Sequence, residues 1–321
     1  MNSGPARAVL ALSGGVGGAK LALGLSRILA PGDLHVLVNT GDDFEHFGLH
    51  ISPDIDTLLY TLSGRADPEQ GWGLAHETFH VLEALRQLGA QTWFRLGDRD
   101  LATHLWRTQQ LAAGSPLSTV TADLAARLGA AAQVYPMCDE PVRTMVHVAG
   151  GSLPFQQYFV REQCAPQVTG FSFEGIEAAT PAAAVTGLLD AGAFAQIVIC
   201  PSNPFVSIDP MLGIPGLWTA LRDSAAPVAV VSPIVAGAAL KGPAAKMMAE
   251  LGLPVTALGV ARHYAEHYPG LVDYFVVDQS DVTLAPDIES LGMAMVAAAT
   301  VMQTLDDRID LARRVLALAE A

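Results

Sequence analysis

Four aspartates within fifteen residues form the densest group of side chains in this chain that could do chemistry. Asp42 and Asp43 follow an apolar run, and Asp54 and Asp56 lie in the segment SPDIDT. Acids that face a phosphate would repel it unless a cation lay between them. Proteins hold magnesium through one or two carboxylates plus substrate phosphates. We therefore predict that Asp42 and Asp56 contact a metal or a ligand and take part in catalysis.

Helix capping gives part of this acidic group a simpler explanation. Ser52 can serve as an N-cap, Pro53 suits the first helical position, and Asp54 in the first turn would favour the helix dipole. Asp56 lies deeper, beside an apolar face that begins at Ile55. Capping therefore accounts for Asp54 more readily than for Asp56.

A glycine-rich turn precedes the acids, in the stretch LSGGVGGAK that ends at Lys20. Glycines lack Cβ atoms, so such a turn can adopt positive φ and bring its N–H groups against an anion. The N-terminus of the helix that follows adds a partial positive charge. We predict that this turn binds a phosphate or pyrophosphate, through Gly14, Gly15, Gly17, Gly18 and Lys20.

The spacing of this turn matches neither of the common nucleotide-binding fingerprints. A GxGxxG pattern that starts at Gly15 would need glycine where Lys20 stands, and Lys20 follows Ala19 rather than the Walker glycine. Glycine at a tight strand-to-helix crossing can also serve packing alone. The residues by themselves therefore leave the ligand of the turn open.

Two later stretches offer further contacts for a nucleotide. The segment CPSNPFVSIDP follows an apolar run and presents the hydroxyl of Ser202 and the amide of Asn203, which could hold a base or a sugar. Arg143 in PMCDEPVRT could serve an anion, as could Lys241 and Lys246 in KGPAAK. A helix start explains the first three residues of KGPAAK equally well.

In the segment LGDRDLATHLWRT, a helix would place four polar side chains on one face, those of Asp100, Thr103, His104 and Arg107. Leu101 and Leu105 would lie on another face and are the expected core contacts. The polar stripe is either a solvated helix face or a functional one, in which the planar guanidinium of Arg107 clamps a phosphate.

Charge and cysteine content exclude several classes of protein. The formal net charge is -14, which argues against a nucleic-acid partner and against an anionic membrane surface. The three cysteines lie far apart, so we expect neither a disulfide framework nor a thiolate zinc site. No signal-peptide pattern is visible, and no apolar run reaches the roughly 18 residues of a membrane helix. We predict a cytoplasmic location.

The apolar runs predict a doubly wound α/β fold with a mainly parallel sheet. Strands are expected near 8–12, 34–38, 195–200, 227–231 and 274–277, and helices near 54–63, 76–88 and 98–113. We predict a single domain over 1–321, with a mostly helical elaboration at about 57–160 that lies over the ligand edge of the sheet. Extended runs at 143–148 and 155–161 are expected to continue this elaboration.

Eight segments in order along the chain carry a family resemblance: GGVGGAKL, VNTGDD, ISPDIDTLLY, LGDRDLATH, PMCDEPVRT, FQQYFV, CPSNPFVSIDP and SPIVAGAALKGPAAKMM. With them the chain resembles the 2-phospho-L-lactate transferases of deazaflavin coenzyme F-420 biosynthesis. The resemblance implies a Rossmann-like fold, a homodimer and a requirement for Mg²⁺. It also implies two substrates, the deazariboflavin precursor Fo and a guanosine diphosphate ester of a three-carbon acid.

The reaction implied by this resemblance is the transfer of a substituted phosphate. The terminal ribityl hydroxyl of Fo would attack the phosphorus that bears the three-carbon acid, with release of GMP. By the resemblance, Asp56 and Arg95 bind Fo, and Asp42 and Asp56 hold the magnesium ion. The glycine turn would hold the diphosphate.

Two positions depart from the family pattern and leave the transferred acid open. Cys138 stands where serine is expected, and Asp209 stands where glycine is common. Derivatives of 2-phospholactate, phosphoenolpyruvate and 3-phosphoglycerate all fit at this point. The alternative function is a non-catalytic regulator that binds nucleotide sugars on the same Rossmann-like core. A dehydrogenase does not fit, because the turn lacks the required glycine spacing.

Overall fold

A seven-stranded parallel sheet forms the centre of the protein in this computed structural model, which describes residues 8–239 and 242–320. The order β14-β13-β10-β9-β1-β2-β5 is that of a doubly wound sheet, which confirms the predicted fold class. The five strands predicted for this parallel sheet are all present. The seven strands are β1 (Ala8–Ser13), β2 (Leu34–Val38), β5 (Gln133–Pro136), β9 (Phe194–Ile199), β10 (Val228–Val231), β13 (Tyr274–Asp278) and β14 (Ala294–Ala298).

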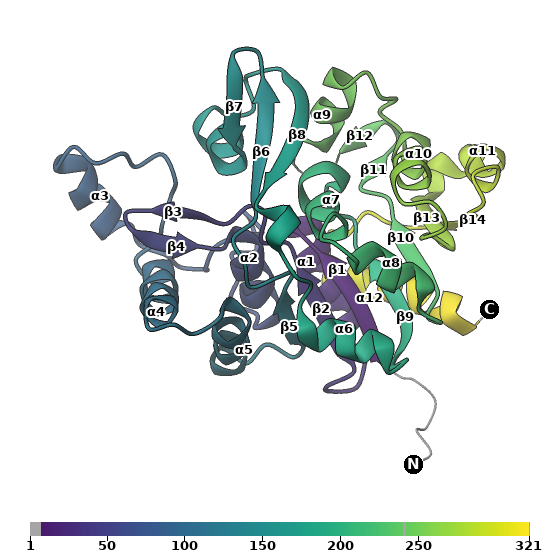
Figure 1. Ribbon diagram of the computed structural model, residues 1–321, viewed down its shortest axis with the longest axis horizontal. Helices are drawn as coiled ribbons and strands as arrows, with labels where there is room; N and C mark the ends of the chain where they lie inside the picture. The colour runs from purple at the N-terminus through teal and green to yellow at the C-terminus, as the bar shows by residue number, and fades with distance from the viewer. Residues whose placement is uncertain (1–7, 240–241, 321) are drawn as a thin grey trace.

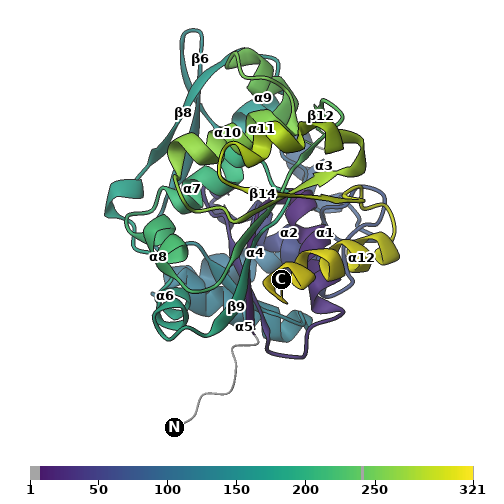
Figure 2. The ribbon, with the colours of Figure 1, turned by 90° about the vertical axis from the view of Figure 1, so that its right-hand side faces the viewer.

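Helices cover both faces of this sheet because its strands are apolar on both sides. In β1, Leu10 and Leu12 join one core cluster, whereas Val9 and Ala11 join the other. Figure 2 shows the two helix layers on either side of the sheet edge. One layer holds α1 (Gly15–Ser26), α2 (Pro53–Leu62), α5 (Leu117–Leu128) and α12 (Leu305–Leu316). The other holds α6 (Ala183–Asp190), α7 (Asp209–Leu212), α8 (Leu217–Asp223), α9 (Ala244–Glu250), α10 (Ala257–His267) and α11 (Ala285–Glu289).

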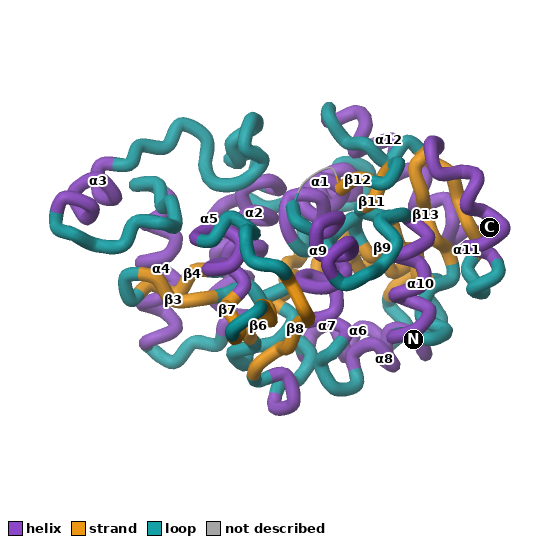
Figure 3. The backbone as a smooth tube through the Cα atoms, turned by 90° about the horizontal axis from the view of Figure 1, so that it is seen from above, coloured by secondary structure: helices purple, strands orange, loops and turns teal. Residues whose placement is uncertain are grey.

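Two elaborations extend from the carboxyl edge of the sheet (Figure 1). The first contains α3 (His80–Gln87), α4 (Asp100–Ala112) and the hairpin of β3 (Phe44–His46) and β4 (Leu49–Ile51). Figure 3 shows the α3 segment at one end of the molecule, beyond this hairpin. The second is the antiparallel sheet β7-β6-β8, formed by β6 (Arg143–Val148), β7 (Gly151–Pro154) and β8 (Val168–Glu174).

The predicted elaboration is therefore helical only in its first part, and one predicted strand is wrong. Residues 155–161 form a helical turn that continues into the π-helix η1 (Gln157–Arg161), not an extended run. The aromatic residues of this segment suggest a strand, but the turn buries Tyr158 completely and stacks the ring of Phe155 on that of Phe159 at 5.4 Å. Tertiary packing thus decides this segment over local propensity.

Short elements complete the fold. They are β11 (Ile234–Val235), β12 (Ala238–Ala239), the 3-10 helices η2 (Ile176–Ala178), η4 (Gln279–Leu284) and η5 (Ala317–Glu320), and the π-helix η3 (Pro204–Ile208). Within the described residues, none of the helices combines the length and the apolar character needed to cross a bilayer.

Candidate active site

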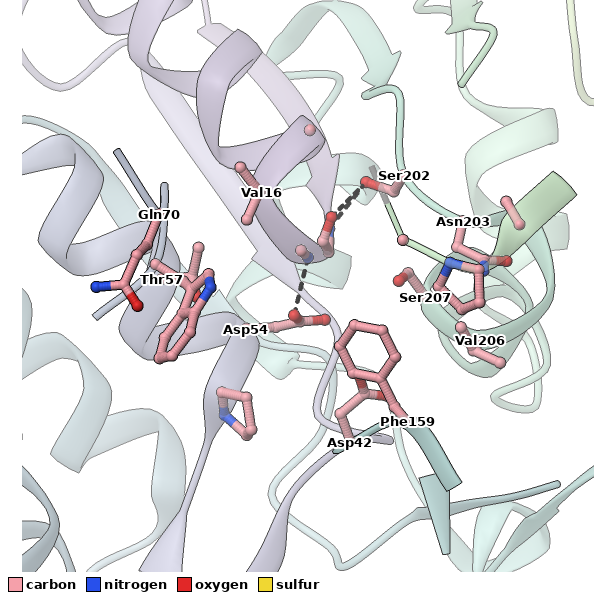
Figure 4. Close-up of a pocket in the computed structure, with 18 of the residues that line it drawn as sticks. Val16, Asp42, Asp54, Thr57, Gln70, Phe159, Ser202, Asn203, Val206 and Ser207 are labelled. Atoms are coloured by element: carbon pink, nitrogen blue, oxygen red, sulfur yellow. Dashed lines mark hydrogen bonds between the residues drawn. The ribbon is translucent and has the colours of Figure 1, made fainter. Parts of the chain in front are cut away.

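A cleft of about 900 Å³ opens at the point where the strand order of the sheet reverses, between β1 and β9. Ligands of open α/β sheets bind at this point, beyond the carboxyl ends of the strands. The glycine turn follows β1, and the segment with Ser202 and Asn203 follows β9. Figure 4 shows side chains from both segments around the cleft. Of the predicted site residues, it is lined by Gly14, Gly15, Gly17, Lys20, Asp42, Asp56, Arg95, Ser202 and Asn203.

Packing within the protein explains three of the four glycines in the turn. A Cβ atom on Gly14 would lie 2.5 Å from the Cβ of Ser207, and one on Gly17 would collide with the carbonyl oxygen of Pro201. Gly18 is enclosed in the same way by the side chains of Ser13 and Ser202, and it does not line the cleft. The packing explanation therefore holds for these positions, whatever the turn binds.

Gly15 is the glycine of this turn that faces open space. Its φ is +63°, and among the described residues no atom lies within 4 Å of the position its Cβ would take. Its N–H donates to Oδ1 of Asp54 at 2.8 Å, the hydrogen bond drawn at Asp54 in Figure 4. Oδ2 of Asp54 accepts from Nδ2 of Asn39 at 2.9 Å. A carboxylate thus lies at the helix N-terminus, where an anion would bind.

Asp54 therefore has a larger role than the favourable interaction with the helix dipole that its sequence position suggested. It lies in the first turn of α2, as predicted, but its carboxylate reaches across to α1. The sequence contained a signal for this contact, because a second acidic residue near a glycine-rich turn needs N–H groups that donate hydrogen bonds to its carboxylate. Spacing along the chain could not show that Gly15 and Asn39 supply the donors.

Asp42 and Asp54 form a buried pair of acids at this end of the cleft. Burial raises the pKa of Asp42 well above its usual range, and the charge of Asp54 raises it further. Burial also raises the pKa of Asp54 to about 6, although the hydrogen bonds from Asn39 and Gly15 oppose this shift. Within the described part of the chain, Oδ1 of Asp42 is buried and has no hydrogen-bond partner. Ionisation of both acids here requires a compensating cation.

The pair fits a divalent cation that also binds a substrate phosphate. The described residues contain no cluster of three His, Cys, Asp or Glu side chains that could hold a metal ion by themselves. Magnesium does not need such a cluster, because it keeps waters and binds substrate phosphates beside one or two carboxylates. The unpartnered oxygen of Asp42 is available as a ligand for the cation. The burial of two carboxyl groups next to each other gives the electrostatic reason for a cation at this site.

Asp56, by contrast, already has a cationic partner. Its Oδ2 accepts from Nη1 of Arg107 at 3.0 Å, and its Oδ1 accepts from Nη2 of the same guanidinium. The predicted phosphate clamp at Arg107 is wrong, because this side chain is completely buried, faces Asp56 and does not line the cleft. The bidentate pairing also favours Asp54 over Asp56 as the companion of Asp42 at a metal ion.

Of the other predicted cations, Arg143 and Lys246 also lie away from the cleft. Arg143 does not line the cleft, and its Nη1 donates to the carbonyl of Val142 at 2.8 Å. Lys246 pairs with Glu250 at 2.6 Å. Lys241 lies outside the described residues. Lys20 does line the cleft, where its Nζ donates to the carbonyl of Met302 at 2.8 Å.

Aromatic side chains that the sequence analysis missed form another part of the cleft wall. Trp72, Trp93 and Phe94 line it together with Arg95, whose guanidinium carbon lies 4.3 Å from the ring centre of Phe79. The run TWFR around Arg95 was the available signal. Planar rings beside a positioned cation suit a flat, partly polar ring system.

The polar stripe of α4 faces inward and is not a solvated surface. Thr103, His104 and Arg107 are buried, whereas Leu105, an expected core contact, is 57% exposed. Leu101 is buried as predicted. The stripe packs against α2, where the hydroxyl of Tyr60 donates to Asp100 at 2.6 Å.

Known proteins resemble this chain in sequence and in fold. The sequence model of the family described as 2-phospho-L-lactate transferase CofD matches residues 9–308. A phosphoenolpyruvate transferase of Streptomyces griseus is 41% identical over 318 residues, which cover 97% of this chain and 98% of that protein. One of Streptomyces avermitilis is 42% identical with the same coverage. A crystal structure of a Bacillus halodurans protein of the UPF0052 family shares the fold, with a TM-score of 0.64, 13% identity, and coverage of 98% of this chain and 100% of that one.

Proposed function

The chain belongs to the 2-phospho-L-lactate transferase CofD family, and from this premise we propose that it transfers a phosphorylated three-carbon acid to Fo in the biosynthesis of coenzyme F-420. The donor is the guanosine diphosphate ester of that acid, and GMP is released. We propose phosphoenolpyruvate as the acid, because the relatives that are 41% and 42% identical bear the name phosphoenolpyruvate transferase. The same family relationship predicts a homodimer.

The observation that carries this proposal is that one cleft is lined both by a glycine turn with buried acids and by aromatic residues beside an arginine. The glycine turn and the acids Asp42 and Asp54 occupy the end at the switch point of the sheet. We assign Asp56 and Arg95, which line the same cleft together with Trp72, Trp93 and Phe94, to its other, aromatic end. Its volume of about 900 Å³ lies toward the top of the usual 300–1,000 Å³ range of ligand pockets, which suits two substrates side by side.

At the phosphate end, the chain positions the donor. Asp42 and Asp54 would hold Mg²⁺, which supplies charge neutralisation for the diphosphate. Gly15 and the side chain of Lys20 line the same cleft and would lie beside the diphosphate, and Asn203 would offer its amide to the nucleoside. Such positioning and charge compensation carry most of the catalysis in phosphoryl transfer.

At the aromatic end, the chain positions the acceptor. Asp56 and Arg95 bind Fo, so that its terminal ribityl hydroxyl points toward the phosphorus that bears the three-carbon acid. A new P–O bond forms from this hydroxyl, its proton is released, and the P–O bond to GMP breaks with the electron pair on the leaving phosphate. The product is a phosphodiester between Fo and the acid.

A mass-spectrometric assay tests this proposal. Purified protein, Fo and Mg²⁺ are mixed in separate tubes with the guanosine diphosphate esters of phosphoenolpyruvate, phospholactate and 3-phosphoglycerate. We expect a phosphodiester and GMP with the phosphoenolpyruvate ester. Product with a different ester alone would correct the acid.

The control is Asp42→Asn, which should keep the fold and lose turnover by a factor on the order of a hundred or more, because an acid that faces the phosphates is gone. Unchanged turnover would contradict the role of Asp42. If no tube yields product while guanosine diphosphate still binds, the regulatory binder becomes the better function.

A further inference from the structure

We infer that His104 is a positioning residue for the acceptor end of the cleft, where it fixes the guanidinium of Arg107 and, through it, the carboxylate of Asp56. This inference rests on the proposed function, since Asp56 is the residue there assigned to Fo. His104 lies on α4, is 1% exposed and lines the cleft. It belongs to a buried group between α2 and α4, the α2–α4 polar cluster, formed by Asp56, Tyr60, Asp100, His104 and Arg107.

Helical spacing explains how the cluster assembles. Asp56 and Tyr60 are four residues apart on α2, so they share one face. Asp100, His104 and Arg107 share a face of α4 at intervals of four and three residues. The two faces meet, and Arg107 reaches across to place both terminal nitrogens on Asp56.

The chemistry of the guanidinium decides the state of His104 in this cluster. Nη1 of Arg107 lies 3.3 Å from Nδ1 of His104, and a guanidinium can only donate. Nδ1 is therefore the acceptor, and the proton of the neutral imidazole is on Nε2. This nitrogen lies 3.2 Å from Oδ2 of Asp100, which is an ion-pair distance, although it makes no hydrogen bond of regular geometry within the described part of the chain. The opposite tautomer would point an N–H group at the guanidinium and would leave no N–H group facing Asp100.

Asp100 anchors this chain of contacts from the far side. Its Oδ1 accepts from the hydroxyl of Tyr60 at 2.6 Å. Burial raises the pKa of Asp100, but the contact with His104 and the hydrogen bond from Tyr60 lower it more, so that the pKa lies below its usual value. Asp100 is thus held as a carboxylate that orients the ring of His104.

The contacts among His104, Arg107 and Asp56 control the position of the Asp56 carboxylate. The carboxylate of Asp56 lines the cleft, but its direction is set by a guanidinium that lies behind the wall. Besides Asp56, Nη1 of Arg107 faces the carbonyl of His50 at 3.5 Å and Nδ1 of His104 at 3.3 Å, and the nearer contact with His104 restrains its rotation. Loss of that acceptor leaves the ion pair in place and loosens its geometry. Partners that orient a binding group in this way change affinity on the order of tenfold when they are removed.

Three substitutions at His104 separate positioning from simple filling of space. His104→Asn keeps an acceptor near the place of Nδ1 and leaves volume unfilled. His104→Phe keeps a ring of similar size without any nitrogen. His104→Gln places its amide near Nε2, toward Asp100. A matched control is His263→Phe, because His263 is also buried and pairs with Asp209 at 2.9 Å but does not line the cleft.

The measurement is calorimetric titration of each variant with Fo and, separately, with guanosine diphosphate and Mg²⁺. We expect His104→Phe to weaken Fo binding about tenfold and His104→Asn to stay within about twofold of the parent protein. Binding of guanosine diphosphate should change less than about twofold in both, and His263→Phe should leave Fo binding unchanged. If His104→Phe does not fold, tighter Fo binding by His104→Asn than by His104→Gln supports the inference.

Several results would overturn the inference that His104 is a positioning residue. Fo binding that survives in His104→Phe and falls in His104→Asn would show that the side chain only fills space. Equal losses for both substrates would show general damage to the cleft. If the parent protein binds guanosine diphosphate but not Fo, the proposed acceptor is wrong and the inference falls with it. If the parent binds Fo and every His104 variant binds it equally well, the inference alone fails.

Discussion

Asp42 and Asp54 are held in an arrangement that a protein selected for stability alone would avoid. Both carboxyl groups are buried next to each other, and burial raises both pKa values. One oxygen of Asp42 has no partner among the described residues. Unfavourable electrostatics of this kind concentrate at functional sites, where a ligand compensates them.

Gly15 offers the sharper test of whether the glycine turn binds a phosphate, because close packing within the protein already explains why Gly17 is a glycine. Gly15→Ala places a methyl group in open space at φ +63°, which should lower the free energy of unfolding by about 1 kcal/mol. The same methyl group narrows the phosphate end, so the affinity for guanosine diphosphate should fall. Gly17→Ala should destabilise more, by about 2 kcal/mol or more, because it collides with the Pro201 carbonyl.

Thermal unfolding and titration with guanosine diphosphate check both variants of the turn. Full nucleotide affinity in a folded Gly15→Ala protein would show that the phosphate does not approach this amide. A Gly17→Ala protein as stable as its Gly15→Ala counterpart would contradict the packing explanation.

Helix α4 shows how an element can present its polar side inward. Glu77 accepts from the backbone N–H groups of Arg99 and Asp100, at 2.9 and 2.6 Å, and so fixes the start of the helix. The helix then buries its polar stripe against α2.

The π-helices η1 and η3 also contribute to the cleft, because each supplies residues that line it, Phe159 and Ser207 among them. Such insertions into helical segments recur at functional sites.

Arg107 should therefore carry more stability than any exposed residue of α4. Arg107→Leu leaves Asp56 without its cation, and loss of one partner of a buried ion pair costs about 3–5 kcal/mol. Leu105→Ala is the control, since its side chain is 57% exposed and its removal should change stability by less than about 1 kcal/mol. Denaturant titration measures both changes.

A double variant makes this comparison stricter. Asp56→Leu combined with Arg107→Leu should recover part of the stability, because it leaves no unpaired charge. If the double variant is no more stable than Arg107→Leu, the loss comes from packing rather than from charge.

The architecture of the whole molecule brings the two acids and the glycine turn together. Strand order reverses between β1 and β9, so the loops that follow these strands meet at the carboxyl edge of the sheet. The long connection between β2 and β5 then places α2 beside α1 and the aromatic residues across the cleft. Segments from Gly14 to Gln303 contribute to one cleft.

The stability of the ligand-free protein should consequently depend on pH through Asp54. Its folded pKa of about 6 lies above the ordinary value of 3.8, so the folded state binds the proton more tightly. The stabilisation from this proton is present at low pH and is lost as pH rises through about 6. The variant Asp54→Asn carries no charge there. Its stability relative to the parent should increase from pH 4 to pH 7, by on the order of 2–3 kcal/mol, and then level off.

Calorimetric unfolding in the presence of a chelator measures this difference. Addition of Mg²⁺ with guanosine diphosphate should stabilise the parent at pH 8 and stabilise Asp54→Asn less, because binding to the folded state adds to its stability. A difference between the two proteins that does not change with pH would contradict the buried, uncompensated carboxylate.

The sequence by itself determined the parallel sheet, the glycine turn and the acidic group. Continuous apolar runs such as Leu34 to Val38 are typical of strands that are buried on both faces, and this pattern is local. The chemistry of glycine and of the carboxylates also follows from the residue type alone, whichever residues lie next to them in the fold. Most of the predicted cleft residues, Asp42 and Arg95 among them, accordingly line the cleft.

Only the tertiary structure decided which partner each of these groups has. The sequence predicts that the stripe with Arg107 is a solvated or phosphate-binding face, and only its packing against α2 shows otherwise. Likewise, Asp54 is explained by the helix dipole until α1 lies beside it. Residues 155–161 have the composition of a strand, yet burial of Tyr158 makes them helical. Partners far apart in the chain set the energies of buried polar groups, because desolvation must be offset by a specific neighbour, and spacing along the sequence cannot identify that neighbour.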